Sequence, residues 1–347
     1  MMRNPAIDSY RGLGILLVIV AHVTFVPELL NQFLYSFGMT VFFMLSGFLF
    51  NAQKARRSPA WYIKEKFYRL VIPAWVIGMV CGIPYLFFVI TGHIPREEFL
   101  TRLVGTLVGY PDRDYNFNCT PIWFLFCLFV LETIATLVVC RFERHYRAVF
   151  FAIGLVGLAV SITTDIFIPF EIDVALFAFF YFSLGSYLRD YDVFNIKLGF
   201  PHAVMCVLSF AVWAVMIYLS DDKFLIASNR IGTGWNILYN LVSSFCGTYV
   251  FYYVSRFLSA SKGFSKSLSW LGVHTLPILG FNYMIDYVVF KLLTHYSLYA
   301  WELALVIQLM IFVPFVMLLD KTGLLGRVIN GRVGPSKAKQ PEVAEAR

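Results

Sequence analysis

Long apolar runs separated by short polar connections make up most of the chain, and this pattern predicts membrane-spanning helices. A helix needs about 20 apolar residues to cross a hydrocarbon core of ~30 Å. The predicted fold class is an all-α integral membrane protein, a bundle of about ten transmembrane helices. The ten predicted spans cover about residues 12–27, 33–50, 70–90, 121–140, 148–167, 173–188, 202–219, 236–256, 268–290 and 301–319.

Composition and charge support a membrane bundle and orient it. The chain is 59% apolar and 14% charged, whereas soluble domains carry about 25% charged residues. Of its 28 Lys and Arg residues, 22 lie on one side of the predicted spans and six on the other. The positive-inside rule therefore places both termini in the cytoplasm. The net charge of +7 does not indicate nucleic acid, because the basic residues lie in loops between spans, so the expected partner surface is the lipid bilayer.

The first apolar run carries the candidate chemistry. Arg11 and His22 are eleven residues apart, which puts both on one helix face, about 16 Å apart along the axis. Asp8 lies one turn before Arg11, where the two charges can meet. With Arg11 at the membrane surface, His22 is expected near the midplane, facing a protein interior or a water-filled path. A structural histidine bonded to a neighbouring helix fits the spacing equally well.

The run from Asp8 through Arg11 to His22, with ten residues between the arginine and the histidine, resembles the opening of the membrane acyltransferase 3 family. Members of that family transfer acyl groups, usually acetyl from acetyl-CoA, to surface polysaccharides and other extracytoplasmic acceptors. The resemblance implies that His22, Arg11 and Asp8 are the catalytic residues, with Asp8 positioning Arg11. His22 is expected to act either as a general base or as an acyl-carrying nucleophile.

Two later stretches extend the resemblance. Residues 41–49 contain the family's Phe-Phe-x-x-Ser-Gly pattern, in which Ser46 and Gly47 are expected chiefly to pack against another helix. Residues 64–73 resemble an Arg-x-x-Arg motif followed by proline, with Lys66 replacing the first arginine and Arg69 standing at the second. The resemblance implies that Arg11, Lys66 and Arg69 bind the phosphates of the acyl-CoA donor. A positive-inside anchor or a lipid-phosphate contact is the alternative for this basic segment.

Three further residues are expected on the acceptor side or along the internal path. Trp123 opens the fourth span with a family-like aromatic motif, and an interfacial aromatic belt is its alternative role. Glu132 lies about two and a half turns deeper and is expected to pair with His22 or to line the path. Asn282 stands where the family often has a histidine, and Pro277 is expected to kink that span.

The remaining segments define the predicted boundaries. Residues 1–320 are expected to form the transmembrane acyltransferase domain, and residues 321–347 a disordered cytoplasmic tail. The external connection 91–120 serves either as a sugar-binding loop or as a plain connector, and 220–235 is expected to be an uninformative outer loop. The six cysteines are scattered singly without metal-ligand spacing, so no metal site is predicted.

Together these features predict an integral membrane O-acyltransferase in the bacterial cytoplasmic (inner) membrane. It is expected to transfer acetyl from cytoplasmic acetyl-CoA, a co-substrate rather than a bound cofactor, to a hydroxyl of a lipid-linked or surface polysaccharide. O-antigen, common-antigen and exopolysaccharide sugars are the leading acceptor classes. A transporter or flippase of a sugar-containing substrate is the alternative, and several motif matches in the expected order favour the enzyme.

Overall fold

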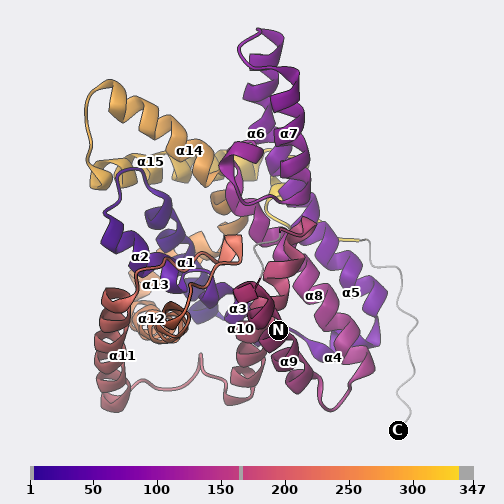
Figure 1. The fold of residues 1–347 in the computed structure, drawn as a ribbon, viewed down its shortest axis with the longest axis vertical. Coiled ribbons are helices and arrows are strands. Elements are labelled where there is room, and N and C mark those ends of the chain that lie inside the picture. The colour runs from indigo at the N-terminus through magenta and orange to yellow at the C-terminus, as the bar shows by residue number, and fades with distance from the viewer. Residues whose placement is uncertain (1–3, 164–166, 336–347) are drawn as a thin grey trace.

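The computed structural model describes residues 4–163 and 167–335, and within these ranges the chain is helical without a β-strand (Figure 1). A lone bridge between Leu225 and Arg230 closes a loop there. The α-helices are α1 (Pro5–His22), α2 (Glu28–Phe37), α3 (Thr40–Leu49), α4 (Ala52–Arg57), α5 (Pro59–Lys66), α6 (Ile72–Ile90), α7 (Arg96–Val108), α8 (Trp123–Arg141), α9 (Tyr146–Thr163), α10 (Ile172–Leu188), α11 (Phe200–Leu219), α12 (Trp235–Ser259), α13 (Lys262–Val273), α14 (Thr275–His295), α15 (Trp301–Lys321) and α16 (Leu324–Ile329).

Eight helical segments of the described chain are long and apolar enough to cross a membrane. This finding confirms an all-α, multi-pass membrane protein. Two of the ten predicted spans are not among the eight: α1 carries Asp8 and Arg11, and α12 carries several polar residues that are buried against its neighbours. The count of ten and the cytoplasmic placement of the termini stay predictions.

Helix α1 begins and ends earlier than the predicted span 12–27. The Asn4 side chain accepts a hydrogen bond from the Ala6 backbone N–H at 2.9 Å, and a proline follows at the first helical position, which together start the helix. The helix ends at His22 because the backbone that follows bonds to another helix instead of continuing α1. The Thr24 N–H donates to Asp286 Oδ1 of α14 at 2.8 Å. His22 is therefore the last residue of α1, rather than a residue midway along a span.

Two other predicted spans each consist of two helices. The span 33–50 is α2 and α3, separated at Gly38 and Met39, and the span 268–290 is α13 and α14, separated at His274. Pro277 lies in the first turn of α14, where its missing N–H costs no helical hydrogen bond. The expected kink is thus a complete break one turn before the proline.

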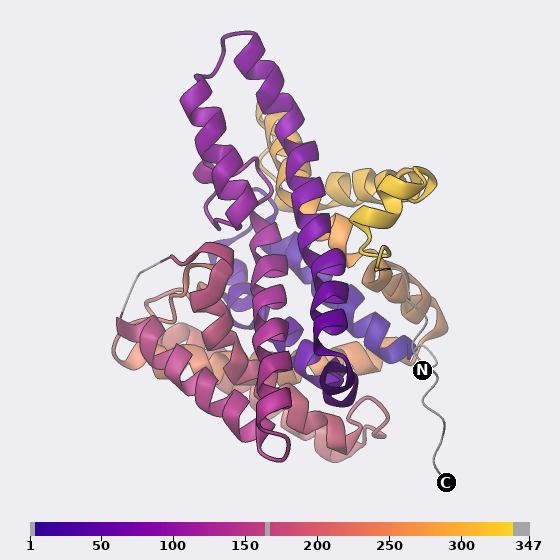
Figure 2. The same cartoon turned by 90° about the vertical axis from the view of Figure 1, so that its right-hand side faces the viewer.

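The stretch Pro59–Ile90 is a continuous helical segment of 32 residues, much longer than the predicted span 70–90. The connection 91–120, predicted as a loop, contains helix α7, which packs back against α6. The α6–α7 hairpin projects beyond the rest of the molecule (Figure 2).

The tail also differs from the prediction. The disorder expected from residue 321 onward does not hold for residues 321–335, which include helix α16 packed against α6 and α15. The apolar residue Ile329 is 1% exposed, so this segment has its own anchor in the core. Residues 336–347 lie outside the described residues.

Small residues let α3 and α10 pack with their backbones in contact, as predicted for Gly47. A Cβ on Gly47 would lie 1.9 Å from the Phe182 carbonyl oxygen, and a Cβ on Gly185 would lie 1.9 Å from the Met44 carbonyl oxygen. Each helix therefore offers a glycine to the backbone of the other. This reciprocal contact fixes α3 at the centre of the bundle, beside the site described below.

We predict that Gly47→Ala lowers the thermal unfolding midpoint in detergent, because the added methyl forces α3 away from α10 at a cost of about 1–3 kcal/mol. Gly263→Ala is the matched control: among the described residues, no atom outside its own helix backbone and chain neighbours lies within 4 Å of a Cβ there, and alanine favours a helix over glycine by about 0.5–1 kcal/mol. Equal midpoints for the two variants would contradict the backbone contact.

Candidate functional site

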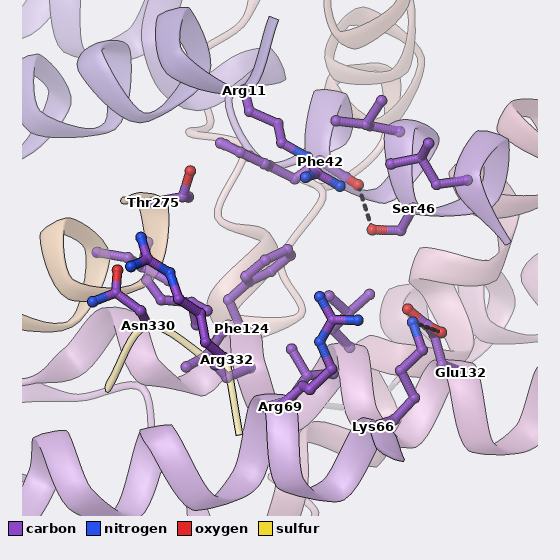
Figure 3. Close-up of a pocket in the computed structure, with 18 of the residues that line it drawn as sticks. Arg11, Phe42, Ser46, Lys66, Arg69, Phe124, Glu132, Thr275, Asn330 and Arg332 are labelled. Carbon is purple, nitrogen blue, oxygen red and sulfur yellow. Dashed lines mark hydrogen bonds and ion pairs between the residues drawn. The ribbon is translucent and has the colours of Figure 1, made fainter. Parts of the chain in front are cut away.

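A basic cavity of about 740 Å³ opens among α1, α3, α5, α8, α14 and the segment that follows α16. Its basic lining residues are Arg11, Lys66, Arg69 and Arg332, and its acidic ones are Asp8, Glu65 and Glu132. Arg11 reaches into it from one side, and Arg69 and Arg332 from the opposite side (Figure 3). The three cations that the sequence assigns to the donor therefore line one cavity, with Arg11 on α1 and the other two on the continuous segment Pro59–Ile90.

Glu132 pairs with Lys66, not with His22. Lys66 Nζ lies 2.5 Å from Glu132 Oε2, and the Tyr62 hydroxyl donates to the same oxygen at 3.1 Å. The Glu132 side chain is 6% exposed, and a buried carboxylate needs a charged or hydrogen-bonding partner. Because α5 packs on α8, Lys66 supplies that partner, and Glu132 lines the basic cavity rather than the predicted acceptor path.

Arg69 lies in a distorted part of its helix. Residues Phe67–Val71 form a π-helix between α5 and α6. Pro73 has no N–H to donate to the carbonyl four residues earlier, which is that of Arg69, so regular α-helical bonding cannot continue there. Glu65 Oε1 lies 3.5 Å from Arg69 Nη1, and the arginine remains half-exposed at the cavity mouth. Such π-segments occur frequently at functional sites.

Close packing of α1 against α13 places Asp8 and Arg11 at the cavity wall. A Cβ on Gly12 would lie 1.8 Å from the Leu268 carbonyl oxygen, and one on Gly272 would lie 2.0 Å from the Asp8 carbonyl oxygen. The two backbones are therefore in direct contact over this turn. Asp8 is 8% exposed and lines the same cavity as Arg11.

His22 lines a second, smaller cavity of about 180 Å³ at the other end of α1. Trp123 lines it too and is 5% exposed, so it faces this cavity rather than a lipid-facing aromatic belt. The rings of Tyr35 and Tyr283 flank the imidazole, with centroids 5.7 Å and 5.0 Å from it. The structure thus brings together His22 and Trp123, which the sequence placed in separate spans.

The hydrogen bond of the His22 ring defines which nitrogen can do chemistry. His22 Nδ1 lies 2.7 Å from the Val18 carbonyl oxygen, and because a carbonyl oxygen can only accept, Nδ1 carries the proton in this bond. In the neutral ring the lone pair is therefore on Nε2. Among the described residues, Nε2 has no hydrogen-bond partner, so it is available to a ligand in the cavity.

The loop 220–235, predicted to be an uninformative outer loop, forms part of this second cavity. Residues 224–228 line the cavity beside His22. Asp222 Oδ2 accepts three hydrogen bonds: from the Thr233 hydroxyl at 2.9 Å, from the Thr233 N–H at 3.0 Å and from Asn236 Nδ2 at 3.1 Å. These bonds lower the pKa of the Asp222 carboxyl and fold the loop. The cavity shares Thr120 and Tyr283 with a polar hollow of about 440 Å³ that also contains Arg113.

Apolar side chains form a partition between the two cavities. The Phe42 ring lies against Gly14 of α1, where a Cβ would come within 2.8 Å of Phe42 Cζ. Phe42 also packs on Phe124 of α8, with ring centroids 5.8 Å apart. Leu279 of α14 lines both cavities. The basic cavity and the histidine cavity therefore meet end to end along α1.

The chain matches the model of the acyltransferase domain family over residues 4–319. It belongs to this family. The match confirms the resemblance carried by the first apolar run, and it makes the protein a membrane acyltransferase. No curated protein and no solved structure matches the chain.

Not every predicted residue of the acyltransferase reaches these cavities. Asn282 is fully buried and lines neither of the two, and its side-chain atoms make no hydrogen bond among the described residues. Conversely, sequence reasoning missed Tyr35, Tyr283 and Arg332. The tyrosines lie in apolar runs that look uniformly structural, and Arg332 lies in the segment predicted to be disordered.

We predict that Lys66→Met destabilises the acyltransferase strongly, by about 3–5 kcal/mol, because it leaves the Glu132 carboxylate buried without its cation. The double variant Lys66→Met/Glu132→Gln should recover much of this loss, as measured by thermal unfolding midpoints. The control is Lys223→Met, which breaks an exposed pair with Glu28 whose contribution is about 1 kcal/mol or less. A double variant as unstable as the single one would contradict the pairing.

Proposed function

We propose that this acyltransferase transfers an acyl group, most simply acetyl, from acyl-CoA to a hydroxyl of an extracytoplasmic polysaccharide or lipid-linked sugar in the bacterial cytoplasmic membrane. The observation that supports this proposal is the arrangement of two cavities end to end along α1. One is basic and suits a polyanionic donor, and the other presents His22, whose Nε2 has no hydrogen-bond partner in the described part of the chain.

The basic cavity suits CoA because phosphate groups require cations and cannot enter hydrocarbon. Arginine binds phosphate through paired N–H groups, and Arg11 and Arg69 line opposite walls of the cavity. Lys66 contributes less, because Glu132 neutralises it. The thin pantetheine arm can then carry the thioester toward Leu279 and the partition, while the phosphates stay at the mouth.

The second cavity suits a sugar hydroxyl. Trp123, Tyr35 and Tyr283 give flat aromatic walls, and the adjoining hollow offers polar groups such as Arg113 and Asp173. Such a mixture of aromatic and polar groups binds a sugar by stacking on its faces and hydrogen-bonding its hydroxyls. We place the acceptor here, with its reactive hydroxyl at His22 Nε2.

In the resulting reaction, His22 Nε2 takes the proton of the acceptor hydroxyl, and the hydroxyl oxygen attacks the thioester carbonyl carbon. The carbon–sulfur bond breaks, and the departing CoA sulfur receives the proton from the imidazole. The products are the O-acylated sugar and free CoA. In the alternative, Nε2 itself attacks the thioester and carries the acyl group before the hydroxyl takes it. Family membership favours either route over a transporter or flippase.

We predict that His22→Ala in liposomes with radiolabelled acetyl-CoA lowers acetyl transfer to a glycan pool by roughly 10²–10⁴-fold, the usual contribution of a general base. His295→Ala, at the exposed end of α14, is the control and should retain activity. Label on the wild-type protein without acceptor would show the covalent route. If the wild-type protein labels neither glycan nor itself and does not bind CoA, the acetyl-CoA donor is wrong.

A further inference from the structure

The chain that follows α16 returns to the basic cavity and forms part of its wall. Residues 330–334 all line the cavity. These residues lie beyond the family match, which ends at residue 319. Their position is fixed from two sides, because α16 packs on α6 and α15 just before them. We call residues 330–334 the strap.

The strap meets the π-helix that carries Arg69. Gly331 has φ +61°, and a Cβ there would lie 2.8 Å from the Arg69 carbonyl oxygen and 2.9 Å from Leu276 Cδ1. Only glycine allows this backbone shape and this close approach together. The contact places the backbone of the strap against that of Arg69, and the Arg332 and Arg69 side chains both extend into the cavity from the side opposite Arg11 (Figure 3).

Arg332 is held in place by a cluster outside the cavity. Its Nη1 donates to Asp320 Oδ1 at 3.1 Å, and its Nη2 lies 3.2 Å from His274 Nε2. Asp320 Oδ2 lies 2.9 Å from His274 Nε2, so the carboxylate joins the two side chains. Asn330 Nδ2 donates to Asp320 Oδ1 at 3.2 Å and ties the start of the strap to the same group.

We propose that Arg332 is a phosphate-binding residue for the acyl-CoA donor, presented to the basic cavity by the strap. Arg332 lines the same cavity as Arg11 and Arg69, and several cations around one cavity favour an anionic ligand there. The Arg332 guanidinium has five N–H groups, and those not turned to Asp320 and His274 remain for a ligand. Its side chain is 42% exposed, which suits a phosphate at the cavity mouth rather than the thioester deeper inside.

Asp320 and His274 are positioning residues in this proposal, because they touch Arg332 and not the cavity itself. His274 is 5% exposed and lies at the break between α13 and α14. The break therefore turns its ring toward the end of α15, where Asp320 is. The inference rests on the proposed function, since it assumes that the cavity holds acyl-CoA.

The test measures CoA binding by calorimetry to the full-length protein in nanodiscs of zwitterionic phosphatidylcholine. We expect Arg332→Gln to weaken CoA binding roughly ten- to hundredfold, the loss typical of a charge-assisted hydrogen bond. Arg332→Lys should recover part of the affinity, and Asp320→Asn should lose part of it. The control is Arg327→Gln, an exposed arginine of α16 that does not line the cavity; it should bind CoA like the wild type.

The other outcomes contradict the role of Arg332, the proposed donor or the source of the phosphate. If the wild type binds CoA and Arg332→Gln binds it equally well, the role of Arg332 is wrong and the proposed donor stands. If the wild type does not bind CoA, the donor and this inference fail together. If Arg332→Gln changes only the binding of phosphatidylglycerol, added to the nanodiscs, the phosphate partner is a lipid headgroup and not CoA. The unfolding midpoints of the ligand-free variants are the control for stability. If they match the midpoint of Arg327→Gln, a loss of CoA binding does not come from a loss of structure.

Discussion

The direct backbone contact between α1 and α13 is the interaction on which the rest of the site depends. In a membrane there is no hydrophobic gain from joining two apolar helices, so their association relies on close packing of small residues. Gly12 and Gly272 provide that packing. The contact holds α1 in the interior of the bundle, with Arg11 in one cavity and His22 in another, and a single rigid helix thereby sets the distance between the two chemical groups.

Polar side chains inside the bundle are arranged around this helix by the need to pair. Glu132 takes Lys66 and Tyr62, and Asp286 takes the Thr24 N–H and Gln308 Nε2 at 2.6 Å. The two carboxylates serve different ends of α1. The pair at Glu132 fixes a wall of the basic cavity, whereas Asp286 ends the helix at His22. Both are long-range contacts between helices that the sequence does not place next to each other.

The same residues show which features the sequence predicted and which it did not. The apolar runs predicted the helices, and the family-like motifs predicted that Arg11, Lys66 and Arg69 act together. The helix breaks at Gly38 and His274 were not predicted, because each lies inside an apolar run where the local signal for an end is weak. The prediction that Glu132 pairs with His22 was wrong, because pairing depends on which helices pack together, and the sequence does not show this. The strap was missed because a segment rich in glycine and charge resembles a disordered tail until its tertiary contacts are known.

The partition formed by Phe42, Phe124 and Leu279 has a consequence for the cell as a whole. A protein hollowed from both faces would let water form a continuous file through the bilayer, and ions would follow it down the membrane potential. The apolar side chains between the cavities prevent this, since a charge among them loses its hydration without replacement. Helix α1 can therefore present a polar group to each of two cavities without an open path for ions between them.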